Sequence, residues 1–283
     1  MRQFIKSFCG SIGFLSDETV WNGLVIYSEG GAYAPYISGM LHSLEITYSG
    51  KAYYLTSDPV DPLLRDTPRH LRAFFIGKGI MRTIVFNTMR TKVLAMTMPD
   101  LNTFHIKRSP RVQHYTYFHH SLVSTHMVYR KGAFDHFDSM MCVGPYHQDE
   151  VREWEALHGL PPKQLFDHGS PPLDTLAEFQ KISPRFSPDE NDRLNVLLAP
   201  SWGPDGLMET NARKVVQILI NAGHHVCVRP HPRTRQLAAK VLDELAEAFS
   251  ENPNFEMNED ISGHDLLLRS HVMISDWSGV AME

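Results

Sequence analysis

Short apolar runs rich in β-branched residues recur along this chain of 283 residues, and polar turn residues follow them. Near the end, His225-Val226-Cys227-Val228 is followed by Arg229-Pro230-His231-Pro232, and Val272-Met273-Ile274 is followed by Ser275-Asp276-Trp277-Ser278-Gly279. Runs of this kind are typical of buried parallel strands that end at the carboxyl edge of an α/β sheet. Ligands of open α/β sheets bind at that edge. The pattern therefore predicts both the fold class and the edge of the sheet at which a site should lie.

The first part of the chain contains one complete unit of this pattern. Residues 23–28 predict a buried strand, 33–46 a helix with one apolar face, and 51–56 a second strand. In this order they form a parallel βαβ unit. Gly30 and Gly31 follow the first strand, and we expect a tight turn there whose backbone can approach an acceptor. A purely structural turn is the alternative, because two glycines are too few for a dinucleotide-binding fingerprint.

Length and composition indicate a globular protein of two domains. Hydrophobic residues make up 42% of the chain and charged residues 21%, and 283 residues suit two domains of ordinary size. The polar segment 179–192 is the predicted linker between a first α/β domain, 21–178, and a second, 193–283. Residues 1–20 form an amphipathic segment, which we interpret as a helix packed on its own protein. A peripheral contact with a membrane is the alternative.

The charge balance and the cysteines exclude several classes of protein. A formal net charge of -5 provides no cationic field for a nucleic-acid backbone, so nucleic acid is not an expected partner. Three scattered cysteines give neither a disulfide framework nor zinc-ligand spacing, which indicates a reducing, cytoplasmic setting. No apolar run approaches the ~18 residues of a membrane span.

The polar residues after the two late runs have the chemistry of a phosphate site. Arg229 offers a fork of N–H donors, and His231 offers a donor that can carry charge. Ser275 and Ser278 add hydroxyls beside backbone N–H groups at a predicted helix start. Each segment alone also fits a structural role, a rigid turn in the first case and a helix cap in the second. Two such segments after successive strands favour a shared site for a phosphate or diphosphate.

The two segments together also carry a family resemblance. Their residue types and order resemble the donor half of the CDP-glycerol glycerophosphotransferases, the teichoic-acid polymerase and primase family. The resemblance implies a GT-B fold, in which two Rossmann-like domains with parallel sheets face a cleft. It also implies that the donor's diphosphate is held by Arg229, His231, Ser275, Asp276 and Ser278. Gly279 stands where the family has a serine, so a backbone N–H replaces one hydroxyl there.

A histidine pair in the first domain extends the resemblance. The segment 117–124 resembles the family's strand end, where a histidine is the base for the acceptor hydroxyl, and His120 is the matched residue. Ser121 stands where the family has glycine, which indicates a divergent branch. His119 is the alternative base, because consecutive residues of an extended segment point in opposite directions and only one should face the cleft. The resemblance covers roughly residues 110–283 and implies neither a metal nor a cofactor.

The resemblance implies a reaction as well as a fold. The expected activity is transfer of glycerophosphate from CDP-glycerol, or a related nucleotide-activated donor, to a hydroxyl of a lipid-linked or polymer acceptor, with release of CMP. Such a reaction would build a teichoic-acid-like or capsule-like surface polymer at the inner face of the cell membrane. Two alternatives stay open: a GT-B glycosyltransferase that uses a nucleotide sugar, and an inactive fragment that only binds ligand.

The end of the chain bears on the last alternative. Residues 193–283 contain about four predicted strands, and the final motif stands where a helix should begin. We therefore expect the second domain to be incomplete and to lack part of its ligand pocket.

Overall fold

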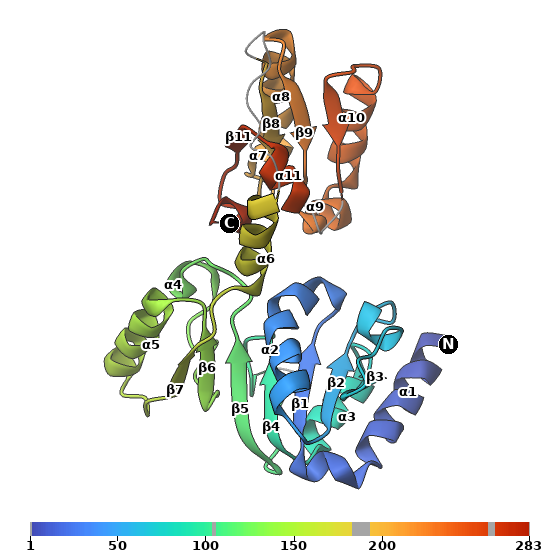
Figure 1. Cartoon of the computed structure of the whole chain (residues 1–283), viewed down its shortest axis with the longest axis vertical. Helices are drawn as coiled ribbons and strands as arrows, with labels where there is room; N and C mark the ends of the chain where they lie inside the picture. The colour runs from blue at the N-terminus through green and yellow to red at the C-terminus, as the bar shows by residue number, and fades with distance from the viewer. Residues whose placement is uncertain (1, 104–105, 183–192, 260–263, 283) are drawn as a thin grey trace. The chain divides into compact units, whose positions relative to one another are not determined.

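The computed structural model describes residues 2–103, 106–182, 193–259 and 264–282. Contacts divide the chain into two compact units, Met1–Pro172 and Leu173–Glu283, each built on a parallel sheet (Figure 1). This boundary lies earlier than the one expected from the sequence, so most of α6 (Pro171–Ile182) belongs to the second unit. The expected linker, 179–192, begins inside α6 and from residue 183 lies outside the described residues.

The first unit contains a seven-stranded sheet in which every neighbouring pair of strands is parallel. The strands are β1 (Leu24–Ser28), β2 (Ala52–Thr56), β3 (Leu71–Phe75), β4 (Thr91–Met96), β5 (Val112–Phe118), β6 (Ser139–Cys142) and β7 (Gln164–Asp167). Their spatial order is β3-β2-β1-β4-β5-β6-β7. The chain adds β2 and β3 on one side of β1 and then β4 on the other, so the topological switch point lies between β1 and β4.

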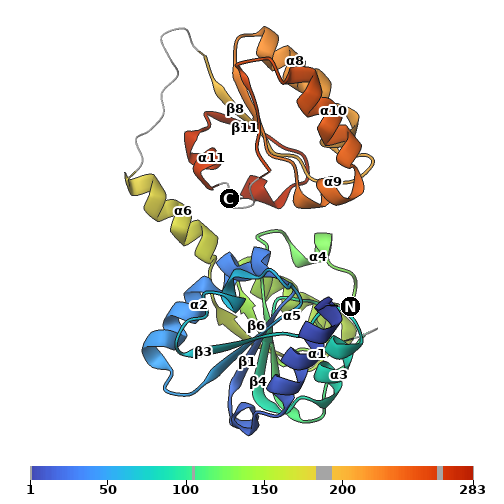
Figure 2. The ribbon, with the colours of Figure 1, turned by 90° about the vertical axis from the view of Figure 1, so that its right-hand side faces the viewer.

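Alternate side chains of these strands pack into separate cores on the two faces of the sheet. Tyr27 and Tyr53 point to the face covered by α1 (Arg2–Leu15), α3 (Ile80–Thr88) and α5 (Pro145–His158). Ile26 and Tyr54 point to the face covered by α2 (Ala34–Thr47), which Figure 2 shows across the strands from α1 and α3. The predicted elements 23–28, 33–46 and 51–56 are thus confirmed as β1, α2 and β2.

The short helices of this unit are η1 (Glu18–Asn22), η2 (Gly31–Tyr33), η3 (Pro62–Leu64) and α4 (Thr125–Val128).

The amino-terminal helix α1 is part of the first unit. It packs against β3 and α3, and Ser7, Ser11 and Phe14 are its buried residues. Gly10 is required by this contact, since a Cβ there would lie 2.1 Å from the carbonyl oxygen of Phe75. The outer side of the helix exposes large apolar side chains, namely those of Phe4, Ile5, Phe8 and Ile12. None of the helices in the described ranges has the length and apolarity needed to cross a membrane.

The second unit has a four-stranded parallel sheet in the order β10-β9-β8-β11. The strands are β8 (Asn195–Leu198), β9 (His225–Val228), β10 (Phe255–Met257) and β11 (Val272–Ile274). One face packs on α8 (Ala212–Asn221) and α10 (Ala239–Phe249), and the other on α11 (His264–Arg269). Shorter helices are α7 (Leu207–Thr210), α9 (Pro232–Leu237) and η4 (Gly279–Met282). Because β9 and β11 lie on opposite sides of β8, this sheet has its switch point between β8 and β11.

A buried ion cluster joins α5 to β7. Glu155 is 4% exposed, and its Oε1 accepts the backbone N–H of Lys163 at 2.8 Å. The Lys163 ammonium lies 3.7 Å from the same oxygen, and its side chain is 5% exposed. Arg152 donates to Oε2 at 2.5 Å and to the Lys163 carbonyl oxygen at 2.9 Å. The Glu155 carboxylate therefore neutralises a buried ammonium and fixes the turn that leads into β7.

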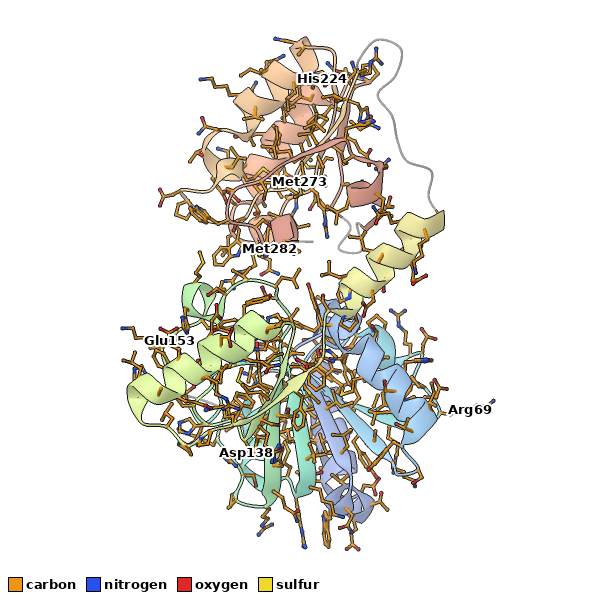
Figure 3. The ribbon with its side chains drawn as sticks, turned by 60° about the vertical axis from the view of Figure 1, so that its left-hand side comes forward. Arg69, Asp138, Glu153, His224, Met273 and Met282 are labelled. Atoms are coloured by element: carbon orange, nitrogen blue, oxygen red, sulfur yellow. The ribbon has the colours of Figure 1, made fainter. Side chains whose placement is uncertain are left out.

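Replacing Glu155 with Gln should destabilise the first unit strongly. The substitution keeps the size of the side chain but leaves the Lys163 ammonium buried without its counter-charge, which costs about 3–5 kcal/mol. Chemical denaturation should detect this as a lower free energy of unfolding. Glu153→Gln is the matched control, because Glu153 is exposed on the same helix and is labelled in Figure 3. If the two variants were equally stable, the ion cluster would have no role in stability.

Candidate functional site

The carboxyl edge of the first sheet gathers the residues predicted for that domain. Glu29, Gly30 and Gly31 follow β1, and the pair His119-His120 follows β5. β4 lies between these two strands and ends at the same edge. The segments therefore flank the switch point, where the loops after neighbouring strands leave the sheet on opposite faces.

His120 lies among four tyrosine rings. Its ring centroid is 5.0 Å from that of Tyr33 and 6.1 Å from that of Tyr36, both edge-to-face. The rings of Tyr117 and Tyr129 are each 6.3 Å away, again edge-to-face. These tyrosines come from η2, α2, β5 and the end of α4. Packing from several elements holds the imidazole in one orientation, while one part of the residue stays in contact with solvent.

Hydrogen bonds within this cluster fix the tautomer of His120. Tyr117 donates its hydroxyl proton to the oxygen of Tyr129 at 3.2 Å. His120 Nδ1 lies 3.3 Å from the Tyr117 oxygen, and a phenol has only one proton to donate. Nδ1 is therefore the donor in that pair. Nε2 is the nitrogen that remains able to accept a proton.

The surroundings also keep His120 neutral. Burial among protein atoms lowers its pKa to about 4, and hydrogen bonds to the backbone of Thr97 and Phe118 oppose this shift. A general base must be unprotonated at the working pH, but a pKa this low makes His120 a weak base in the ligand-free protein. An anionic ligand beside the ring would raise the pKa towards neutrality.

His119 packs inside the protein. It is 2% exposed and stacks on His147 with ring centroids 4.1 Å apart. Neither of its ring nitrogens has a hydrogen-bond partner among the residues that the structure describes. Desolvation, and then the nearby His147, lower its pKa well below the usual value. Of the two adjacent histidines, His120 is the one in contact with solvent, whereas His119 is buried.

The two glycines after β1 allow a close approach of chain segments. Gly31 begins η2, and a Cβ there would lie 2.5 Å from Cδ of Pro62. Gly30 is buried and donates its N–H to Oγ of Ser28 at 3.2 Å. These contacts fix the turn that carries Tyr33 to the ring of His120. Both glycines therefore belong to a tight turn, and the approach of their backbone to an acceptor stays a prediction.

The loop after His120 is held by α5. Ser121 accepts the backbone N–H of Val123 at 3.2 Å, and the carbonyl oxygen of Val123 lies 3.1 Å from Nε2 of His147. Glu150 accepts both the N–H and the hydroxyl of Thr125, at 2.7 and 2.5 Å. Ser121 thus shapes the loop, and the loop in turn places Tyr129 beside His120.

In the second unit, the two predicted motifs lie on either side of β8. The motif that begins with Arg229 leaves β9, and the motif that begins with Ser275 leaves β11. Both strands pair with β8, and the backbone N–H of Arg229 donates to the carbonyl oxygen of Leu198 at 2.9 Å. The motifs therefore share one edge of one sheet, next to its switch point.

His231 caps α9. Its Nδ1 accepts the backbone N–H of Arg233 at 3.1 Å, so the neutral ring carries its proton on Nε2. Burial, followed by the charges of Arg233 and Arg229, lowers its pKa. The lowered pKa favours the neutral form of His231, in which Nε2 is an N–H donor, as the sequence suggested.

Asp276 binds backbone groups of the loop after β8. Its Oδ1 accepts the N–H of Ser201 at 2.5 Å, and its Oδ2 accepts the N–H of Leu207 at 2.8 Å. A carboxylate with both oxygens engaged, and with the same sign of charge as a diphosphate, is better suited to positioning the loop than to touching a donor. We therefore interpret Asp276 as a positioning residue.

The other residues of this motif differ in their contacts. Ser275 donates its hydroxyl to the carbonyl oxygen of Ala199 at 2.8 Å, which ties β11 to the end of β8. Ser278 and Gly279 lie at the start of η4, and the Ser278 carbonyl oxygen accepts the N–H of Ala281 at 3.1 Å. The neighbouring Trp277 is 85% exposed. Ser278 and Gly279 are thus the members of the motif at the half-buried start of a helical turn.

Sequence analysis missed the tyrosines around His120 and also Glu29. Burial, and then the charge of Glu29, raise the pKa of Tyr33 to about 12, and Glu29 contributes to the raised pKa of Tyr117. Burial also raises the pKa of Glu29 itself. The charge of Glu29 therefore disfavours ionisation of both phenols. The place of Glu29 directly after β1 was the one signal in the sequence that could have identified it.

Comparison with known proteins supports the fold. No family model matches the sequence, and no curated protein matches it. Among solved structures, the wall teichoic acid polymerase TagF matches with a TM-score of 0.56 and 14% identity, over 99% of this chain and 75% of TagF. The UDP-GlcNAc 2-epimerase from Methanocaldococcus jannaschii, in complex with UDP-GlcNAc and UDP, matches with a TM-score of 0.59 and 13% identity, over 91% of this chain and 80% of that one.

A third match agrees with these two. The UDP-N-acetylglucosamine 2-epimerase from Rickettsia bellii has a TM-score of 0.58 and 9% identity, over 93% of this chain and 76% of that one. Identities this low establish a shared fold and leave the reaction to be argued from the site. The chain therefore has the α/β architecture of GT-B proteins, with two Rossmann-like units built on parallel sheets.

Proposed function

We propose that this chain is a GT-B transferase that passes glycerophosphate from CDP-glycerol, or a related nucleotide-activated donor, to a hydroxyl of a lipid-linked or polymer acceptor. The observation that carries this proposal is the placement of Arg229 and Ser275 after β9 and β11, on either side of β8. The fold shared with TagF supports it. The product would be a surface polymer made at the inner face of the cell membrane, with CMP released.

On the acceptor side, His120 would act as the base. As the acceptor oxygen attacks the β-phosphorus of CDP-glycerol, its proton passes to Nε2 of His120, the ring nitrogen that carries no proton when Nδ1 donates to Tyr117. The bond from the β-phosphorus to the bridging oxygen breaks, and that oxygen leaves with CMP. A bound anionic group beside the ring would raise the low pKa of His120, so its base strength would appear only in the complex.

On the donor side, charge develops on the bridging oxygen and the phosphate oxygens. The guanidinium of Arg229, the Nε2–H of His231 and the backbone N–H groups near Ser278 and Gly279 would stabilise it. Asp276 and Ser275 would keep these donors in place through their hydrogen bonds to the β8 end and its loop. Preorganised donors of this kind lower the barrier without reorganising during the reaction.

The tyrosine cluster would position the acceptor. Tyr129 also lines a cavity of about 320 Å³, whose other walls include Lys131 and Trp154. A polyanionic acceptor could place its terminal hydroxyl at His120 and its chain along this cavity, where Lys131 supplies positive charge. The exposed apolar side of α1 would allow the peripheral membrane contact that a lipid-linked acceptor calls for.

The test of this function is CMP release from CDP-glycerol, measured with a polymer acceptor and with UDP-sugars as parallel donors. Release from CDP-glycerol alone is the expected result. Turnover of a UDP-sugar without CMP release would favour the second candidate, an enzyme that uses a nucleotide sugar. The fold shared with UDP-GlcNAc 2-epimerases is the reason to test this candidate. Donor binding without turnover of either class would indicate a protein that only binds ligand.

Replacing His120 with Ala should lower kcat by about a hundredfold or more, because the acceptor hydroxyl loses its base. The affinity for CDP-glycerol, measured by calorimetry, should remain close to that of the parent. His42→Ala is the matched control, since His42 is an exposed histidine on α2 and does not line the cavity at Tyr129. Unchanged turnover in the His120 variant would exclude the base assignment.

Replacing Arg229 with Ala should weaken CDP-glycerol binding and slow transfer together, because one guanidinium contact to the diphosphate is worth about 1.5–3 kcal/mol. Calorimetry and initial rates measure the two effects separately. Arg213→Ala, at an exposed position of α8, should change neither. Native donor affinity in the Arg229 variant would remove this residue from the site.

A further inference from the structure

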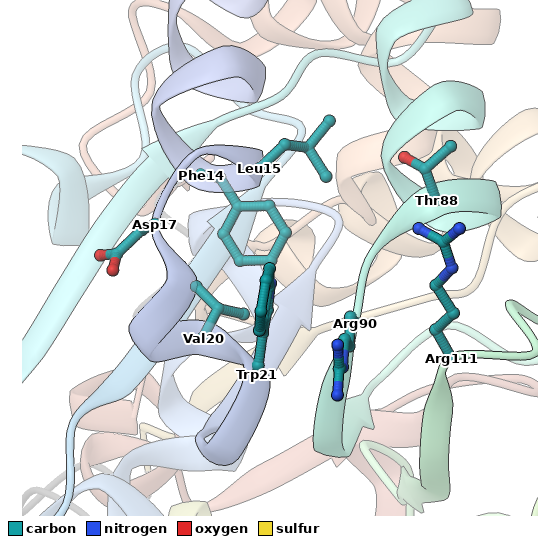
Figure 4. A pocket seen from close by; sticks show the side chains of 8 residues that line it. All are labelled: Phe14, Leu15, Asp17, Val20, Trp21, Thr88, Arg90 and Arg111. Atoms are coloured by element: carbon teal, nitrogen blue, oxygen red, sulfur yellow. The ribbon is translucent and has the colours of Figure 1, made fainter.

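A second cavity of the first unit lies away from His120, at the opposite edge of the same sheet. It measures about 610 Å³ and is drawn in Figure 4. Thr88 ends α3, Arg90 precedes β4 and Arg111 precedes β5, so these lining residues mark the amino-terminal ends of the strands. The end of α1 and the turn η1 close the other side. None of the residues proposed above for transfer lines this cavity.

The cavity wall combines an apolar side with a cationic side. Phe14 and Val20 are buried at 1% and 2% exposure, and Leu15 adds to the apolar side. Arg90 and Arg111 are exposed and reach the cavity from the other side, as Figure 4 shows. A volume of this size is ordinary for a small-molecule site. The lining therefore suits a ligand with an anionic part and an apolar part.

The two arginines are available to a ligand. The guanidinium of Arg90 lies 4.5 Å from the ring centroid of Trp21, an arrangement that uses its face and leaves its in-plane N–H groups for an oxyanion. Neither Arg90 nor Arg111 forms an ion pair within the described part of the chain. The one carboxylate that lines the cavity, Asp17, is itself paired with Arg72.

We propose that this cavity binds a phosphomonoester that carries an apolar chain. The phosphate would lie between Arg90 and Arg111, since two guanidinium groups match its charge and its several oxygens. The chain would lie against Phe14, Leu15 and Trp21. This site is independent of the proposed transfer reaction, because it occupies the other edge of the sheet.

Two sources could supply such a ligand. α1 and α3 both end at the cavity, and both expose apolar side chains along their length, including Phe8, Ile12, Ile80 and Ile84. A lipid phosphate held in a membrane beneath these helices would reach the arginines from that surface. A free phosphomonoester would enter from solution. The chemistry at the arginines is the same in both cases.

The test uses hexyl phosphate as the probe, with inorganic phosphate and hexanol as matched compounds that each lack one half of it. Calorimetry on the full chain should show hexyl phosphate binding at least tenfold more tightly than either compound. Arg90→Gln and Arg111→Gln should each weaken its binding about tenfold, because each removes a charge-assisted contact. Arg69→Gln, at an exposed position outside the cavity lining, should leave it unchanged. Equal thermal midpoints would confirm that all variants are folded.

Vesicles of phosphatidylcholine, with and without phosphatidic acid, distinguish the two sources. Binding that requires phosphatidic acid and is lost in the Arg90 and Arg111 variants would identify a lipid phosphate. Hexyl phosphate binding without any vesicle binding would identify a soluble phosphomonoester. The proposal is overturned if hexanol binds as tightly as hexyl phosphate, or if a folded protein with both arginines replaced keeps the affinity of the parent.

Discussion

The requirement that parallel strands be covered on both faces shapes this protein. In the first sheet, Tyr27 and Ile26 belong to different cores although they are adjacent in β1. A strand buried in this way has little room for charged side chains, because an unpaired charge in either core would be costly. The candidate site residues accordingly lie in the segments just beyond the strand ends. The histidine pair after β5 and the motifs after β9 and β11 follow from this constraint.

Two buried histidines pack next to the candidate base His120. His119 and His147 stack in the interior, and both have lowered pKa values because burial disfavours their charged forms. Two neutral rings can pack face to face, whereas two imidazolium rings would repel each other. The stacked pair His119 and His147 is therefore neutral in the pH range in which His120 itself is neutral.

Much of the fold could be predicted from the sequence, because strand and helix signals are local. The apolar run before Ser28 and the periodicity of α2 each depend on a few consecutive residues, and both elements were found. His120 was singled out by the resemblance of the segment 117–124 to a known family, with His119 as the alternative. The tyrosines at 33, 36 and 129 were not, since their meeting with His120 depends on the packing of distant segments. The cavity at Arg90 and Arg111 was also beyond prediction, because it depends on how α1 packs beside α3.

The hydrogen bonds of Asp276 have a consequence for how a ligand would be recognised. Its carboxylate connects a segment after β11 to two backbone groups of the loop after β8, so these parts of the chain are ordered together. The conformational entropy of that loop is lost during folding and not during ligand binding. A ligand at this edge would therefore meet a surface that is already formed. Its affinity would then depend on the fit of its own atoms, and discrimination between similar donors could be sharp without any closing movement of the loop.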